Sequence, residues 1–563
     1  MLGLRQDGSS NTKGDPNHRS DMEGIIYTIF YNGNIYTQDK AYPHCTALAV
    51  SGGVIMAMGD DEELLKMADG STKTIDLKGM MMLPGFSDTH MHLLSYAQKS
   101  DMLDLSKAKS FDDIRRICSE DIERAERNGK WILGTRFNQD YWDVKKLPDR
   151  RDLDSISTAV PICITRACYH ISVCNTKAME IMGIAGDRQE TTKENIGFFS
   201  DGTPNGVVKE DSQNLIYMSQ PIATIEEIKE MIVRACRDAA AQGITELHTD
   251  DMQSVPGVSW ELVMKAYQQL AEEDKLPVRI YEQCRLVDTD ELKDFLSKGH
   301  MTGESHGFFR LGPLKILSDG SLGAHSAAML EPYKNDPQNN GMLNLRDDEL
   351  MDLCKMAHDS GMQIAIHCIG DRALQQVLDT FETIQKDNPR ADCRHGVIHC
   401  QIMSAKQQDR FREMNILAYV QPVFIKSDMN IAEDCVGHEL AASSYNWRRY
   451  EDLGVHMSGG SDCPVEAFDI LPNIEYTVTR ATPETDRAWF PENGLTIEEA
   501  VRMFTLEAAY ASFSENLHGT LTIGKYADLT VIDRDIFAGL ASDIHNAKVK
   551  LTMTGGKITY SEI

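Results

Sequence analysis

The sequence lacks several features that would place the chain in a special class. Its 13 cysteines include no Cys-x-x-Cys pair, and we interpret them as reduced, mostly buried thiols of a cytoplasmic protein. No apolar run approaches the roughly 20 residues that span a bilayer. Basic residues are outnumbered, 57 Lys and Arg against 86 Asp and Glu, and the net charge of −29 opposes binding to nucleic acid or anionic membranes. The expected partner is therefore a small molecule; a homodimer stays open.

The composition is that of a folded protein. The 563 residues can bury a large core, and 42% hydrophobic and 25% charged residues are ordinary values for globular chains. The polar stretch 1–22 has nothing to bury, so we predict that it is a disordered leader, native or added.

The two ends of the chain share a β-rich pattern. Residues 23–84 alternate short β-rich runs with glycine turns, and residues 515–563 contain the similar runs ADLTVIDRD and VKLTMTGGKITYSEI. We predict that both ends combine into one small composite β-sandwich domain.

Between the ends, short apolar runs alternate with helical patterns. The runs ITELHT, VRIYEQ, LGPLKIL, MQIAIHC, GVIHC, ILAYVQ and VHMSGG are each followed by polar residues, as is typical of buried parallel strands. Residues 85–514 are therefore predicted to form an α/β fold, a (β/α)8 TIM barrel, with a doubly wound open sheet as the alternative. Residues from about 95 to 242 are too many for one βα unit and are predicted to be an inserted α/β subdomain after the first barrel strand. Capped helices are predicted in it from Ser110 to Gly129 and from Thr224 to Gly243.

Candidate metal ligands lie at the ends of the predicted strands. In LPGFSDTHMH, His90 and His92 are two residues apart in a strand, so both side chains point the same way and can meet one metal ion. His367 ends QIAIH, His399 ends GVIH, and Asp462 follows VHMSGGS. Barrel active sites collect side chains from the carboxyl ends of the strands. An HxH pair or a lone histidine is a weak signal by itself, but five such positions favour a shared site.

These motifs, in this order, resemble the metal-dependent amidohydrolases, and within them the amidohydrolase 3 branch that includes N-substituted formamide deformylases. The resemblance runs from about residue 25 to 560. It rests on LPGFSDTHMH, RACYHISVCNTKAM, DGTPNGVVKED, GITELHTDD, LKILSDGSLGAHSAAMLEPY, IAIHCIGDRAL, RHGVIHCQ, VQPVF, GGSDCPVE and GTLTIGKYADLTVID.

The resemblance implies a role for each candidate. His90 and His92 match the ligands from the first strand, His367 and His399 those from the fifth and sixth, and Asp462 the carboxylate from the eighth. One or two divalent ions are expected; zinc suits these ligands, with iron, manganese or cobalt as alternatives. A bound zinc ion activates water at neutral pH. Asp462 is suited to take the proton of that water and pass it to the departing nitrogen.

Lys315, in LKILSDG, matches the lysine whose carboxylated form bridges two metal ions in similar enzymes. An unmodified ammonium repels a cation, so Lys315 is expected to be a ligand only as its carbamate. The alternative is an ordinary lysine that holds a carboxylate such as Asp319.

Four further residues are candidates for substrate contact. His170 and Asn175, in RACYHISVCN, resemble substrate-facing positions of the branch; capping or core roles are the alternative. Gln421 follows a strand end and is suited to donate to a substrate carbonyl, and Trp142 is a candidate for lining an apolar pocket, although packing within the insert competes with that role.

Two positions depart from the pattern of the branch. Ile398 stands where relatives place glutamate before the sixth-strand histidine, and His325 where they carry arginine. Both changes bear on the substrate rather than on the metal ligands.

The expected function is hydrolysis of a carbon–nitrogen bond other than a peptide bond, in a small amide or formamide. Deamination of a ring amine is one alternative. A non-catalytic metal-binding regulatory protein on the same barrel is another, although a sensor has no need for the proton shuttle at Asp462.

Overall fold

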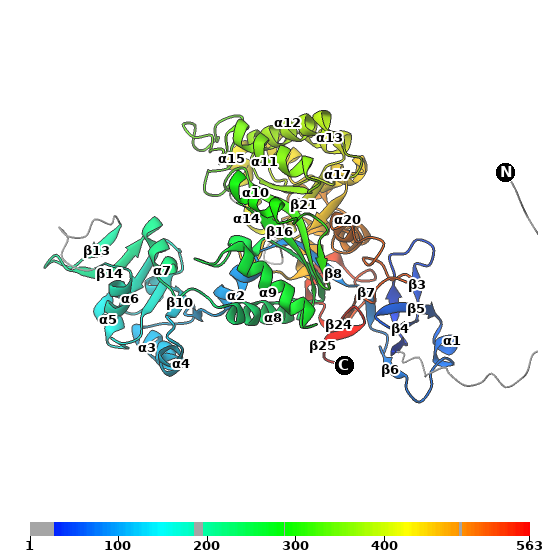
Figure 1. Cartoon of the computed structure of the whole chain (residues 1–563), viewed down its shortest axis with the longest axis horizontal. Coiled ribbons are helices and arrows are strands. Elements are labelled where there is room, and N and C mark those ends of the chain that lie inside the picture. The colour runs from blue at the N-terminus through cyan, green and yellow to red at the C-terminus, as the bar shows by residue number, and fades with distance from the viewer. Residues whose placement is uncertain (1–27, 185–194, 287, 483–486) are drawn as a thin grey trace, which may run out of the picture.

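The computed structural model describes residues 28–184, 195–286, 288–482 and 487–563. A central barrel lies between a β-rich region and a separate α/β region (Figure 1). The predicted leader lies outside the described residues. In the part that is described, no helix is long and apolar enough to cross a membrane.

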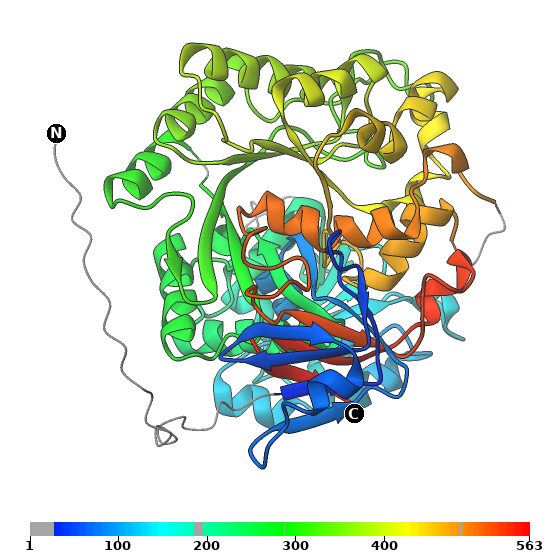
Figure 2. The same ribbon diagram turned by 90° about the vertical axis from the view of Figure 1, so that its right-hand side faces the viewer.

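Eight parallel strands form a nearly closed barrel, which confirms the predicted TIM-barrel fold (Figure 2). Each strand pairs with the next one along the chain, and all of these pairs are parallel. The strands are β8 (Phe86–Met91), β15 (Ile244–Thr249), β16 (Arg279–Arg285), β18 (Phe309–Leu317), β19 (Ile364–Cys368), β20 (Gly396–His399), β21 (Leu417–Val420) and β22 (Met457–Gly459), with the short β17 (Ser305–His306) added antiparallel to β18.

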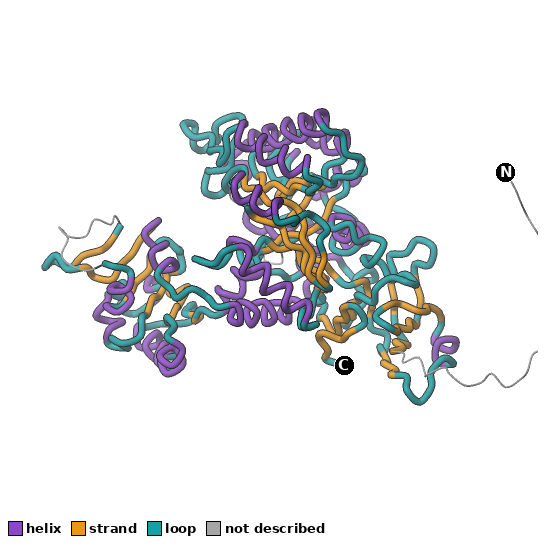
Figure 3. The backbone as a smooth tube through the Cα atoms, viewed as in Figure 1, coloured by secondary structure: helices purple, strands orange, loops and turns teal. Residues whose placement is uncertain are grey.

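Helices cover the outside of the barrel, so the strands are buried on both faces and their apolar runs are continuous (Figure 3). The helices are α2 (Leu93–Ser100), α8 (Ile225–Ala241), α9 (Trp260–Glu272), α10 (Thr289–Ser297), α11 (Asp347–Asp359), α12 (Asp371–Asp387), α13 (Ala405–Met414), α14 (Ile425–Asp428), α15 (Ala432–Val436), α16 (His438–Ser443), α17 (Trp447–Leu453), α18 (Ile470–Thr479), α19 (Ile497–Met503) and α20 (Leu506–Ala511). Three short 3₁₀ turns accompany them: η3 (Asp251–Gln253), η4 (Pro422–Phe424) and η5 (Pro491–Asn493).

The β-rich region joins both ends of the chain. Strand β7 (Met81–Pro84) pairs in parallel with β2 (Asn34–Tyr36) and antiparallel with β23 (Leu529–Ile532), so one six-stranded sheet contains N-terminal and C-terminal strands. A second sheet packs against it across a shared apolar core. The other elements are β1 (Thr28–Tyr31), β3 (His44–Cys45), β4 (Ala47–Ser51), β5 (Val54–Gly59), α1 (Asp61–Leu65), β6 (Lys73–Asp76), β24 (Val549–Thr554) and β25 (Lys557–Ser561). The 3₁₀ turn η6 (Ala541–Asn546), between β23 and β24, packs on α18 of the barrel.

The separate α/β region is built on its own six-stranded sheet and core. Its elements are β9 (Leu103–Asp104), α3 (Phe111–Ser119), α4 (Ile122–Asn128), β10 (Ile132–Phe137), η1 (Gln139–Tyr141), α5 (Arg150–Asp154), β11 (Ile162–Arg166), β12 (Ile171–Cys174), α6 (Thr176–Ile181), β13 (Ile196–Phe198), β14 (Pro204–Lys209), η2 (Glu210–Gln213) and α7 (Asn214–Met218). Two predictions need adjustment. The helix expected from Ser110 to Gly129 is two helices, α3 and α4, and α8, which was assigned to the insert, packs its apolar face into the barrel core.

The chain path orients the barrel. Strand β8 follows β7 of the β-rich region and leads at its carboxyl end into α2 and then into the insert. The β-rich region and the insert therefore lie at opposite ends of the barrel (Figure 1). The insert stands beside the end where the strands finish, which is where active sites of this fold lie.

Glu499 joins two of the barrel helices. It completes the capping box of α19 with Thr496, and its carboxylate accepts from both terminal nitrogens of Arg448 on α17. The Arg448 guanidinium lowers the pKa of Glu499 to about 2 from 4.5. We expect Glu499→Gln to destabilise the fold by about 1 kcal/mol at neutral pH. Because the folded pKa lies below the unfolded one, this contribution is complete above about pH 4.5 and disappears as the pH falls through about 2.

Urea unfolding at about pH 7 and about pH 3.5 measures this difference, which should be smaller at the lower pH. Exposed Glu413→Gln is the control and should change stability at neither pH. An equal loss at both pH values for Glu499→Gln would show that the carboxylate charge contributes nothing.

Candidate metal centre and active site

Three of the predicted ligands converge at the carboxyl end of the barrel. His90 lies on β8, His399 ends β20, and Asp462 follows β22 after two residues. One ligand atom from each lies within 4.8 Å of the others, and all three residues are buried. Parallel strands end at one rim, so residues more than 300 positions apart in the chain meet there.

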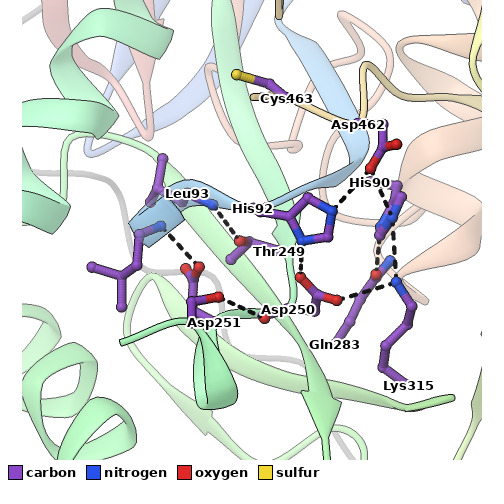
Figure 4. Close-up of polar contacts among 12 residues, drawn as sticks. His90, His92, Leu93, Thr249, Asp250, Asp251, Gln283, Lys315, Asp462 and Cys463 are labelled. Atoms are coloured by element: carbon purple, nitrogen blue, oxygen red, sulfur yellow. Dashed lines mark hydrogen bonds and ion pairs between the residues drawn. The ribbon is translucent and has the colours of Figure 1, made fainter. Parts of the chain in front are cut away.

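His92 is also part of this group (Figure 4). Its Nε2 lies 2.9 Å from Oδ1 of Asp462, and Nε2 of His90 lies 3.4 Å from the same oxygen. The two imidazole rings are 5.1 Å apart, as expected for side chains two residues apart on one strand face.

His367 lies at the edge of the group. Its ring centroid is 4.5 Å from that of His399, but its Nε2 donates to the carbonyl of Gly320 at 3.2 Å. The structure therefore places His367 beside the cluster, with one ring nitrogen turned to the backbone.

Lys315 is fully buried on β18 and lies between a histidine and a carboxylate. Its Nζ is 3.2 Å from Nε2 of His90 and donates to Oδ2 of Asp250 at 3.2 Å. Asp319, which was considered as its carboxylate partner, instead accepts three backbone N–H groups, those of Ala328, Ile369 and Gly370. The carboxylate beside Lys315 is thus Asp250, and the expectation for Asp319 is corrected.

Asp250 and Gln283 hydrogen-bond the Nδ1 atoms of His92 and His90. The Oδ1 of Asp250 bonds Nδ1 of His92, and Oε1 of Gln283 lies 2.8 Å from Nδ1 of His90 (Figure 4). With their Nδ1 atoms occupied, both rings turn Nε2 toward Asp462. Partners of this kind fix the tautomer and the orientation of a metal-binding histidine.

The surroundings keep three of the histidines neutral. Burial lowers the pKa of His399 to about 4, and burial lowers the pKa values of His90 and His367 well below the ordinary value. His92 differs: burial lowers its pKa, but the carboxylates of Asp250 and Asp462 outweigh burial and raise it to about 10. A neutral imidazole keeps a lone pair free for a metal ion.

The loop after β22 is held tightly against β8. A Cβ at Gly460 would lie 2.6 Å from the backbone nitrogen of His90, so the two segments approach closely only because this residue is glycine. Buried Asp88 accepts from the backbone N–H groups of Ser461 and His90, and the N–H of Asp462 donates to the carbonyl of His90 at 2.8 Å. Asp462 is therefore fixed against the strand that carries the HxH pair.

Two of the converging residues have unusual backbones. The φ angles of His399 and Asp462 are +80° and +58°. Such conformations cost of order 1–3 kcal/mol in residues other than glycine and concentrate at functional sites. At Asp462 the hydrogen bonds that join its loop to β8 help to offset this cost.

The donor set fits a divalent cation. His90, His399 and Asp462 offer two neutral imidazoles and a carboxylate within one coordination distance of each other. In addition, Nδ1 of buried His399 has no hydrogen-bond partner among the described residues. An unpaired buried polar atom is costly, and a ligand that occupies it removes the cost.

The two predicted substrate residues of the β11–β12 hairpin lie outside this cluster. His170 is exposed and pairs with Glu210 at 2.9 Å. Asn175 is fully buried: its Oδ1 accepts from two backbone N–H groups, that of Ala178 as the cap of α6 and that of Ile162, and its Nδ2 donates to two backbone carbonyls. The structure favours a structural role for Asn175, which corrects the expected substrate contact.

The other two candidates for substrate contact, Trp142 and Gln421, have different surroundings. Trp142 is buried in the insert core beside Phe137, and its indole N–H donates to the carbonyl of Ala108 at 2.9 Å, so it packs rather than lines a site. Gln421 follows β21 and lies next to His399; its Nε2 donates to the carbonyl of Tyr419 at 3.2 Å, so the atom left without a partner among the described residues is the acceptor Oε1, not the predicted donor. Gln421 therefore remains a candidate for substrate contact.

Ile398 and His325, the two residues that depart from the expected pattern, each pack against a tyrosine. Ile398 packs inside the barrel in an apolar cluster with Tyr419. The ring of His325 stacks on Tyr333 with centroids 4.6 Å apart.

Sequence reasoning missed Asp250, Gln283 and Asp88. Asp250 directly follows the run ITELHT, so the same strand-end rule that selected His367 would have selected it. Gln283 and Asp88 lie within strands, and only the pairing of those strands reveals their partners.

Comparison with known proteins is consistent with this site. Residues 73–560 match the family model described as "Amidohydrolase family". The putative amidohydrolase YtcJ of Bacillus subtilis is 30% identical over 95% of this chain and 99% of its own length. The N-substituted formamide deformylase of Arthrobacter pascens is 26% identical over 94% and 98%. The structure of an uncharacterized metal-dependent hydrolase from Pyrococcus furiosus, 25% identical, superimposes with a TM-score of 0.76 over 91% of this chain and all of that one.

Proposed function

The chain belongs to the amidohydrolase family, and on this premise we propose that it hydrolyses a carbon–nitrogen bond, other than a peptide bond, in a small amide or formamide. The observation that carries the proposal is the convergence of His90, His399 and Asp462 at the barrel mouth. The formamide class is supported by the similarity to an N-substituted formamide deformylase over nearly the whole chain.

We propose that a divalent metal, zinc in the first instance, is held by His90, His92, His367, His399 and Asp462. Imidazole and carboxylate ligands suit zinc, and a bound divalent ion of this kind lowers the pKa of water and polarises a carbonyl. Lys315 joins this set only as a carbamate; as an ammonium it is the partner of Asp250, with which it makes an ion pair at 3.2 Å.

Asp462 is proposed to move the proton. Its carboxylate lies against both histidines of the first strand, and its backbone is locked to β8, so its position is defined before substrate arrives. Asp462 accepts a proton from the attacking water and delivers it to the leaving nitrogen. An amine leaves poorly unless it is protonated, so this transfer matters more for an amide than for an ester.

Metal removal tests the proposal directly. The protein is dialysed against a chelator and assayed with a panel of N-substituted formamides and acetamides, and metal content is measured by elemental mass spectrometry. We expect release of amine by the loaded protein, loss of this activity with the metal, and recovery when zinc is restored. Turnover that persists without metal, or a loaded protein that cleaves no member of the panel, contradicts the proposed function. A panel of ring amines in the same assay distinguishes deamination.

Gln283 is expected to support metal binding through His90. Gln283→Met keeps the length of the side chain but removes the acceptor that lies 2.8 Å from Nδ1 of His90. Residues that hydrogen-bond a metal ligand typically contribute about 10- to 100-fold to metal affinity. We therefore expect zinc affinity to fall by about 10- to 100-fold in a competition titration with a zinc indicator. The matched control is Gln375→Met on α12, where the glutamine donates to Asp379, away from the cluster. Equal affinities in the two variants would show that Gln283 does not position His90.

A further inference from the structure

Arg285 is a cation at the barrel mouth that has no counterion among the described residues. It is the last residue of β16 and is partly buried. Its guanidinium makes no hydrogen bond or ion pair with any residue in the described ranges of the chain. In a chain with 86 acidic residues and a net charge of −29, an arginine beside a buried site without an acidic partner needs an explanation.

The strand geometry places Arg285 beside the candidate centre. Successive side chains of a strand alternate between faces, so Arg285 shares the face of Gln283, which contacts His90. Arg285 is one step nearer to the open end of the barrel. Arg285 is also paired in register with Lys315 on the adjacent strand. The backbones of adjacent strands lie about 4.8 Å apart. Burial lowers the pKa of Lys315, and the guanidinium of Arg285 lowers it further, in agreement with this proximity.

The carboxylates near this position are used elsewhere. Asp250 bonds His92 and Lys315. Asp251 accepts from the backbone N–H of Leu94 and from the hydroxyl of Tyr267, and Asp319 accepts three backbone N–H groups. Among the described residues, none of these three carboxylates pairs with Arg285, so its guanidinium is free to pair with an anion from outside the chain.

We propose that Arg285 binds a carboxylate of the substrate, so that the substrate class is an amide or formamide that carries a carboxylate, as N-acyl and N-formyl amino acids do. The planar fork of a guanidinium matches the two oxygens of a carboxylate. In an N-acylated α-amino acid, only the nitrogen and Cα separate the amide carbonyl from the carboxyl carbon. Such a molecule therefore carries its carboxylate close to its amide, as Arg285 and His90 both lie close to Lys315. This inference rests on the proposed function, and it defines the substrate more narrowly.

The test compares pairs of probes that differ only in charge. N-Formylglycine and N-formylphenylalanine, and their N-acetyl counterparts, are each used as the free acid and as the neutral primary amide of the carboxyl group. The kcat/KM for deacylation is measured with the metal-loaded wild-type protein and with Arg285→Met, Arg285→Lys and Arg412→Met. Arg412 is exposed on α13 and serves as the matched control. Binding of the same probes is measured by calorimetry in the Asp462→Asn background, so that cleavage does not interfere.

We expect the wild-type protein to prefer the acids. A charge-assisted hydrogen-bonded pair typically contributes about 1.5–3 kcal/mol, so Arg285→Met should lower both kcat/KM and affinity for the acids by about 10- to 100-fold. The same substitution should leave the neutral amides unchanged within about twofold. Arg285→Lys should retain part of the preference for the acids, because lysine keeps the positive charge but lacks the two parallel N–H donors of the guanidinium. Arg412→Met should behave as wild type.

The outcomes separate the two proposals. If acids and amides are cleaved and bound equally well, or if Arg285→Met keeps the preference for acids, the anion subsite is wrong although hydrolysis stands. If no probe is cleaved but the acids bind in a manner that depends on Arg285, the subsite stands and the proposed function fails for this class. If no acid binds at all, the subsite is refuted. If Arg285→Met does not fold, the comparison of Arg285→Lys with wild type decides.

Discussion

Asp462→Asn is expected to lower kcat/KM for amide hydrolysis by about 10²- to 10⁴-fold while metal stays bound, because that is the usual contribution of a positioned general acid–base group. The amide of asparagine preserves the shape of the side chain and one oxygen acceptor toward His90 and His92, whose Nε2 atoms lie 3.4 and 2.9 Å from Oδ1 of Asp462. It cannot accept the proton of water at neutral pH. Steady-state kinetics, together with metal content from elemental mass spectrometry, measure the two properties separately.

A comparison of substrates distinguishes proton transfer from simple disturbance of the site. An ester with the same acyl group has a leaving group that depends less on protonation, so Asp462→Asn should impair it less than the amide. Asp434→Asn, on the exposed side of α15, is the control for the loss of one carboxylate. If the asparagine variant retains metal and cleaves the amide within a fewfold of wild type, Asp462 is not the shuttle.

The sequence was sufficient to predict the barrel because the barrel depends on local patterns. A buried parallel strand appears as a short continuous apolar run, and the alternation of such runs with helices leaves few arrangements other than a closed or open parallel sheet. The strand-end rule then selected His90, His399 and Asp462, which the structure brings together. That rule works without tertiary information because every strand of the barrel points the same way.

The partners behind those residues could not be predicted in the same manner. Whether Lys315 meets Asp250 or Asp319 depends on which strand is adjacent and on how far each side chain reaches, and both aspartates follow strands in the sequence. The bond of Gln283 to His90 joins the first and third barrel strands across the interior, over 193 residues of chain. Such contacts follow from register and shear of the barrel, which apolar periodicity does not encode.

The insert shows the limit of arguing from residue type. Asn175 and Trp142 are polar and aromatic residues of the kind that line binding sites, yet the insert core uses both. For Asn175 an alternative signal was present in the sequence, because an asparagine directly before a helical run is a typical N-cap. Weighing that local structural role first would have removed it from the set of substrate residues.

His399→Ala is expected to lower metal affinity by more than about 100-fold and to abolish hydrolysis at ordinary metal concentrations, since even residues that only support a ligand contribute about 10- to 100-fold. His399 suits this test because its ring is buried in the cluster and its Nδ1 meets the hydrogen-bond criteria with no described residue. Metal content after dialysis, a zinc competition titration and the melting temperature of the metal-free protein measure the effect.

The melting temperature of the metal-free protein separates a metal ligand from a packing residue. The ring of His399 contacts His367 and Phe424, so some packing is lost on truncation. If packing is its main role, His399→Ala should destabilise the metal-free protein as a cavity does, by about 2–5 kcal/mol, and leave zinc affinity intact. If it is a ligand, metal should stabilise the wild-type protein more than the variant, because a ligand that binds only the folded state raises stability by an amount that grows with the logarithm of its affinity. His438→Ala, which removes an exposed histidine of α16, should match wild type in both measurements. Equal stabilisation by zinc of His399→Ala and wild type would exclude His399 from the metal centre.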